Sequence, residues 1–119
     1  MLDPILVLRR VAEALAVGLA FARGLGWDVA TTKLGFAFRW TTLRGRRLQS
    51  WVDPFAPIGG GIANDDEIIT GVELNLDTPP SALAPAVNQA TQELFVLFDG
   101  AQVPLPAIED IVRLVLARR

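Results

Sequence analysis

The chain has 119 residues, of which 51% are hydrophobic, and its 11 basic and 13 acidic residues give a net charge of −2. This length fits one domain, since domains commonly contain about 100–150 residues. The sequence has neither cysteine nor histidine, which excludes disulfides, thiolate sites and imidazole catalysis. No stretch reaches the ~18–20 uncharged apolar residues of a membrane-spanning helix, and Asp3 stands where a signal peptide would be basic. We therefore expect a single cytoplasmic domain over residues 1–119, with no membrane segment.

A long helix is predicted at the start of the chain. Asp3 accepts hydrogen bonds from orphan N–H groups and Pro4 fits the first helical position, so the helix begins here. It runs to about residues 22–23, where Gly24 and Gly26 stop it. Its apolar residues form one stripe of Ile5, Leu8, Ala12, Leu15, Leu19 and Ala22, and a second stripe of Val7, Val11, Ala14, Gly18 and Phe21. A sheet covers only one side of a helix, so we interpret the second stripe as a partner contact; burial of both stripes inside the domain is the alternative.

Three strands are predicted next. Residues 34–40 alternate apolar side chains with polar or small ones, which is the period of a half-buried strand. A turn at 44–46 leads into a second strand at 48–52, and these two strands are expected to form an antiparallel hairpin. After a loop at 54–64, the alternation returns at 68–76. The face expected to lie buried beneath helices includes Leu34, Phe36, Phe38, Val72, Leu74 and Leu76.

Two further helices close the chain. The segment 78–81 breaks the last strand and caps a helix that carries apolar residues from 83 to 98, and Asp99-Gly100 stops it. The segment 104–106 leads into a last helix with apolar residues from 108 to 116. An N-terminal helix, a three-stranded antiparallel sheet and two C-terminal helices packed on one sheet face make an α+β domain.

Charge is segregated along the sequence. Residues 1–47 hold eight basic and three acidic residues, residues 48–112 hold ten acidic and no basic ones, and the last seven residues add three arginines. Such asymmetry suits a nucleic acid, an anionic ligand or a second copy of the chain. Pairing between opposite faces of one domain is the alternative.

Catalytic groups are scarce. Ser81 is interpreted as a helix cap, and Lys33 is the only lysine. The carboxylates at 65–67 lack the alternating spacing of a calcium loop, so we interpret them as a solvated loop tip, with a metal loop as the alternative. The three glycines at 59–61 lack the lysine and hydroxyl residue of a phosphate loop. We expect no metal, no cofactor and no enzyme activity, unless carboxylates converge in a deep pocket.

The segment 39–51 is the strongest binding candidate. Its candidate ligand-binding residues are Arg39, Arg44, Arg46, Arg47 and Trp51. A basic hairpin with aromatic residues can hold phosphates and stack on bases. Trp40 is in phase with the buried face and is expected in the core first. The acidic net charge does not favour nucleic acid as the partner, and arginines that are solvated or paired with acidic residues are the alternative.

Two blocks of the sequence carry a resemblance to a known family. The first is FRWTTLRGRRLQSWVDP at 38–54, and the second spans 66–100, with DTPP at 77–80 and LFDG at 97–100. Together they resemble the C-terminal region of bacterial, often actinobacterial, Schlafen-like or Alba-type ATP-binding and transcriptional-regulator proteins. Those proteins carry an N-terminal DNA-binding domain that these 119 residues lack, so no catalytic role passes to any residue. The resemblance implies a domain that accompanies an effector, for assembly or ligand sensing.

These observations predict a non-catalytic interaction or oligomerisation module, accessory to a bacterial regulatory or effector protein. It is expected to form a homodimer or to dock onto a partner domain. The predicted interface residues are Val7, Val11, Ala14, Gly18 and Phe21. The alternative is a small-ligand or nucleic-acid-sensing domain that uses the arginine-rich hairpin 39–51.

Overall fold

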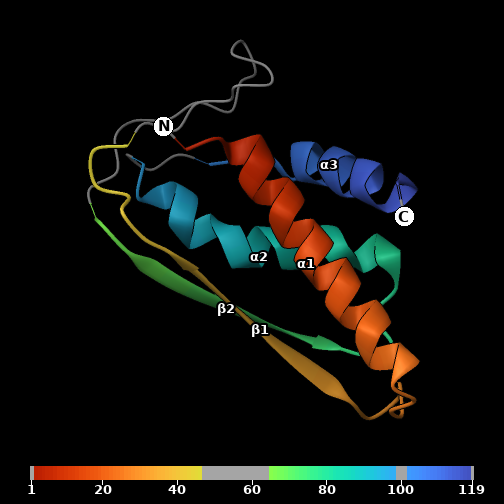
Figure 1. Cartoon of the computed structure of the whole chain (residues 1–119). Helices are drawn as coiled ribbons and strands as arrows, with labels where there is room; N and C mark the ends of the chain where they lie inside the picture. The colour runs from red at the N-terminus through yellow and green to blue at the C-terminus, as the bar shows by residue number, and fades with distance from the viewer. Residues whose placement is uncertain (1, 47–64, 99–101, 119) are drawn as a thin grey trace.

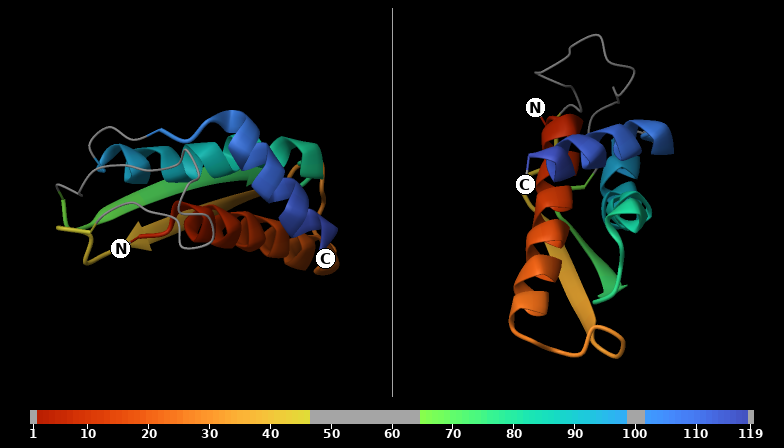
Figure 2. Two further views of the ribbon diagram at one scale, coloured as in Figure 1. Left: turned by 90° about the horizontal axis from the view of Figure 1, so that it is seen from above. Right: turned by 90° about the vertical axis from the view of Figure 1, so that its right-hand side faces the viewer.

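Two helices lie side by side on one face of an antiparallel sheet, and a third helix packs across them (Figure 1). The computed structural model describes residues 2–46, 65–98 and 102–118. In chain order the elements are α1 (Pro4–Gly24), β1 (Lys33–Trp40), β2 (Ile68–Asn75), the 3-10 turn η1 (Pro80–Ala82), α2 (Leu83–Val96) and α3 (Leu105–Ala117). Figure 2 shows α3 on the side of α1 and α2 that faces away from the strands. The α+β class is therefore confirmed, but of the two C-terminal helices expected on the sheet only α2 packs there, because α1 and α2 together provide the surface on which α3 packs.

Helix α1 begins as its sequence predicts. The Asp3 carboxylate accepts hydrogen bonds from the backbone N–H groups of Ile5, at 3.0 Å, and Leu6, at 3.4 Å. The helix ends at Gly24, and Gly26 just beyond it has a positive φ of 81°, a conformation that glycine adopts without a steric penalty.

The end of α1 is tied to the segment that follows β2. Arg23 donates from Nε to the Leu76 carbonyl, at 3.0 Å, and from Nη2 to the Thr78 carbonyl, at 2.7 Å. These two bonds join residues more than fifty positions apart in sequence. They fix where the helix ends relative to the sheet.

The described sheet has two strands. β1 and β2 pair antiparallel in a register that places Lys33 opposite Asn75 and Trp40 opposite Ile68. The predicted strand at 48–52 and the loop at 54–64 fall outside the described residues. The structure thus shows two of the three predicted strands, and these two are hydrogen-bonded to each other.

The two strands differ in how well the helices cover them. Side chains alternate between a covered and an exposed face, as predicted. On β2, Val72 is buried, and so is Leu76 just beyond its end. Thr70 is also buried and donates its hydroxyl to the Ala90 carbonyl of α2, at 2.6 Å. The covered face of β1 is only half-buried along its length.

The expected burial is therefore correct for Val72 and Leu76 and incomplete for Leu74 and for the whole of β1. The expected core residues that stay half-buried against the core are Leu34, Phe36, Phe38 and Leu74. Helix α2 packs directly on β2. Helix α1 comes close to β1 at Gly18, where an added Cβ would lie 2.6 Å from Cε1 of Phe36. The open side of β1 leaves space between this strand and α1.

The C-terminal helices complete the core. Thr78 donates its hydroxyl to the Asn75 carbonyl, at 2.6 Å, and η1 then leads into α2. Phe98 is fully buried just after α2, while the predicted stop at 99–100 lies outside the described residues. In α3, the inward stripe consists of Ile108, Val112 and Val115, all buried.

Candidate functional site

A groove of about 610 Å³ opens between the first half of α1 and the second half of β1. Its apolar lining comes from both elements and includes Leu6, Val7, Val11, Phe38 and Trp40. Three arginines also line the groove: Arg10 from α1, Arg39 from β1 and Arg46 from the turn after β1. Asp3, the cap of α1, also lines the groove. The groove thus combines an apolar wall with three cationic side chains and one anionic one.

The wall of the groove on the β1 side is aromatic. Residues at i and i+2 of a strand share one face, so Phe38 and Trp40 are neighbours on the covered side of β1. Their rings are stacked, with centroids 5.9 Å apart and planes 22° from parallel. Both side chains are half-buried and pack against the core. They present a continuous aromatic surface to whatever enters the groove.

The three arginines differ in their partners. Arg39 donates from Nε and Nη2 to the two carboxylate oxygens of Glu67, at 2.9 and 3.2 Å. Within the described part of the chain, the side chains of Arg10 and Arg46 make no ion pair or hydrogen bond. Two guanidinium groups at the groove are therefore available to an anion, and the third is already engaged.

The predicted ligand-binding residues separate into three groups. Arg39 and Arg46 line the groove. Arg44 is exposed and lies outside the lining; its backbone N–H reaches Oδ1 of Asp66 at 3.4 Å. Arg47 and Trp51 fall outside the described residues. Arg10 was missed, because no local pattern links a helix residue to a strand thirty positions later.

Only part of the predicted interface stripe is exposed. Val7 and Val11 are buried within the chain itself, and Gly18 is packed against Phe36. Ala14 and Phe21 are exposed. The correction follows from where β1 lies, because this strand runs beside the side of α1 that carries Val7, Val11 and Gly18.

A different stripe of α1 faces outward. It consists of Leu6, Arg10, Glu13, Val17 and Phe21, which follow one another at steps of four, three, four and four. Its apolar members have exposed fractions of 40% for Leu6, 50% for Val17 and 69% for Phe21. The helical spacing of this stripe is present in the sequence. It was missed because Arg10 and Glu13 interrupt its apolar residues.

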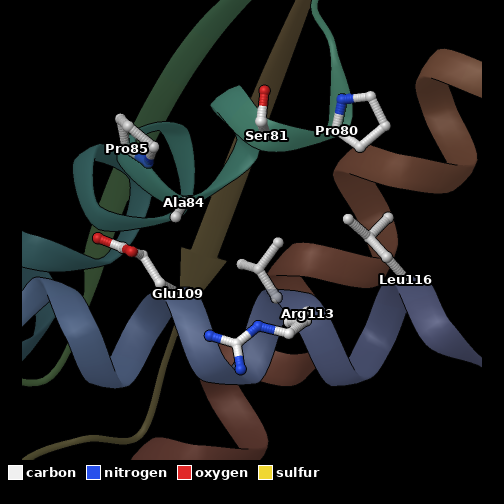
Figure 3. A pocket seen from close by; sticks show the side chains of 8 residues that line it. Pro80, Ser81, Ala84, Pro85, Glu109, Arg113 and Leu116 are labelled. Carbon is white, nitrogen blue, oxygen red and sulfur yellow. The ribbon is translucent and has the colours of Figure 1, made fainter.

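A second cavity, of about 440 Å³, lies between the start of α2 and α3 (Figure 3). Its polar lining residues are Ser81, Glu109 and Arg113, all exposed. Arg113 is paired with Asp110 at 2.7 Å. The side chains are solvated and of mixed charge, so this cavity selects no particular ligand chemistry.

Two of the three acidic residues at 65–67 bind other segments of the described chain. Glu67 pairs with Arg39, and the Asp66 carbonyl accepts a hydrogen bond from the N–H of buried Leu43, at 3.0 Å. Among the described residues, no group of three acidic side chains is arranged to hold a metal ion. Nor is any helix of that part both long and apolar enough to cross a membrane.

Comparison of the chain with models of protein families, with curated proteins and with solved structures found no match in any of the three.

Proposed function

We propose that the chain is a non-catalytic interaction module that forms a homodimer through α1. The observation that carries this proposal is the outward face of α1, where Leu6, Val17 and Phe21 leave large apolar side chains in water. Exposed apolar residues aligned on one helix face mark contact surfaces more often than single exposed ones do. An accessory domain of a bacterial regulatory or effector protein would use such a face for assembly.

Two other sides of α1 already contact the rest of the described chain. Buried residues such as Leu8, Leu15 and Leu19 face the core, and the helix contacts both α2 and α3. Gly18 faces β1. Within the described part of the chain, the open sides of α1 are thus the outward stripe and the groove beside it, which share Leu6 and Arg10.

Light scattering after size-exclusion chromatography tests the proposal. At about 100 µM the wild type should have twice the mass of one chain, because the weak contacts of a single helix face require micromolar concentrations. Val17→Glu places a charge in the contact and should give a folded monomer. Val96→Glu is the matched control, since Val96 is 45% exposed on α2, and it should remain a dimer. A monomeric wild type at 100 µM would show that the proposal is wrong.

A second function is favoured by the groove: binding of a small anion or a nucleic acid. Among the described residues, the guanidinium groups of Arg10 and Arg46 have no partner, so each can form the forked hydrogen bonds that arginine makes with phosphate or carboxylate. The stacked rings of Phe38 and Trp40 offer a surface for a base or another flat apolar group. This is the predicted alternative, with Arg10 added to its binding residues.

Titration with a nucleoside triphosphate and with a single-stranded oligonucleotide, followed by calorimetry, tests the second function. Arg46→Glu should abolish binding, and affinity should fall with added salt because phosphate contacts displace counterions. Arg118→Glu changes the charge equally at an exposed position of the C-terminal end and should bind as the wild type does. If neither ligand gives a heat of binding at low salt, this second function is wrong.

A further inference from the structure

The outward stripe of α1 is complementary to a second copy of itself that runs in the opposite direction. From Leu6 to Val17 it presents an apolar residue, a cation, an anion and an apolar residue. We propose that two copies of α1 pack antiparallel about a two-fold axis, with Leu6 against Val17 of the second copy and Arg10 against its Glu13. This inference rests on the proposed homodimer and names the surface that forms it.

Helix geometry places the four residues together. At about 100° per residue, Leu6, Arg10, Glu13 and Val17 fall within about 60° of the helix circumference. Their spacing is also symmetric, because the midpoint of Leu6 and Val17 and the midpoint of Arg10 and Glu13 both lie between residues 11 and 12. One two-fold axis at that point therefore forms both kinds of contact at once, and each contact occurs twice.

Charge selects the antiparallel orientation. Arg10 and Glu13 are both exposed, and the ion pairs of the described residues involve other side chains. In a parallel pair Arg10 would face the second copy's Arg10, and like charges in a contact are repulsive. In the antiparallel pair each cation meets an anion. Exposed Ala14 and Ala20 beside the stripe leave room for the axes to approach to about 8–10 Å.

The same axis extends the contact to the end of the helix. Phe21, the most exposed of the large apolar residues on α1, lies about 14 Å from the midpoint at 1.5 Å per residue. It therefore reaches just beyond Pro4, where α1 of the second copy begins. The first turns of α1 also line the groove, so each groove borders the dimer contact.

Single cysteines report this register cleanly, because the chain has none of its own. Leu6→Cys mixed with Val17→Cys should form a disulfide-linked dimer under mild oxidation. Neither variant alone should do so, because two copies of Leu6 would lie about 16 Å apart along the axis at 1.5 Å per residue. A disulfide needs Cα atoms within about 7 Å. Leu114→Cys, at a 55% exposed position of α3, is the control and should not link to Val17→Cys.

The outcomes separate this inference from the proposed function. Self-linking of Leu6→Cys and of Val17→Cys would indicate a parallel pair and overturn the register. A dimer by mass without a mixed disulfide would also overturn it and leave the homodimer standing. A monomer by mass would overturn both.

Charge reversal gives an independent measurement. Arg10→Glu and Glu13→Arg should each weaken dimerisation by at least about tenfold, because each variant places like charges opposite one another twice. Combining them restores opposite charges and should recover most of the affinity. Arg44→Glu, which changes the same charge at an exposed residue outside α1, should have no effect. A double variant as weak as the single ones would show that Arg10 and Glu13 do not meet.

Discussion

Replacing Gly18 by alanine tests the contact that seats α1 on β1. The new Cβ would lie 2.6 Å from Cε1 and 2.9 Å from Cζ of Phe36, closer than carbon atoms approach in proteins. The ring must move, and overpacking of this kind costs about 1–3 kcal/mol. Alanine also favours the helix interior over glycine by about 1 kcal/mol. The net effect is a loss of about 0–2 kcal/mol in the free energy of unfolding.

A double-mutant cycle isolates the steric part of this effect. Phe36→Ala removes the ring, so in that background Gly18→Ala should raise the free energy of unfolding by about 1 kcal/mol. The difference between the two backgrounds is the coupling energy, about 1–3 kcal/mol. Gly24→Ala is the control, since nothing lies within 4 Å of its added Cβ, and it should be neutral or stabilising in both backgrounds.

Urea unfolding followed by circular dichroism measures all of these variants. The reasoning is refuted if Gly18→Ala stabilises the wild type as much as it stabilises Phe36→Ala. That result would mean that the Phe36 ring does not rest on the glycine. The position of α1 over β1, and with it the groove beside Phe38, would then be wrong.

Two further predictions concern buried and long-range hydrogen bonds. Thr70→Val should lower the free energy of unfolding by about 1–2 kcal/mol, because its hydroxyl links β2 to the Ala90 carbonyl of α2. Thr91→Val, fully buried but bonded within its own helix, should cost less in the same urea assay, and equal costs would contradict this assignment. Arg23→Lys replaces a planar fork by a single ammonium and should cost about 1 kcal/mol and speed amide exchange after β2. Unchanged exchange there would show that the fork does not hold the segment.

Local chemistry accounts for most of the fold that the sequence predicts. The cap at Asp3 and the glycine at 26 set the ends of α1 because each acts on its own backbone. The alternation at 34–40 and 68–76 places the right residues on the covered face because strand period is also a local property. These signals need no knowledge of which element packs on which.

The packing of the helices against the strands could not be predicted from the sequence. Apolar periodicity marked Val11 as a surface residue, whereas it is buried where α1 borders the groove beside β1, and Val17 takes the exposed position instead. For the same reason, the candidate site was predicted only in part. Arg39 and Arg46 were predicted from their position on the hairpin, but Arg10 joins them only because α1 lies beside β1.

Arg10 belongs both to the groove and to the proposed helix pair, and this sharing has a testable consequence. An anion held by Arg10 draws the guanidinium away from Glu13 of the second copy, so anion binding and dimerisation oppose each other. Linkage requires the two effects to be equal: the factor by which the anion weakens the dimer is the factor by which dimerisation weakens anion binding. Calorimetric titration with a nucleoside triphosphate at protein concentrations below and above the dimerisation constant should therefore give tighter binding to the monomer. Arg10→Gln should abolish the difference, since it removes the shared charge. Equal affinities at both concentrations in the wild type would mean that the groove and the dimer contact act independently.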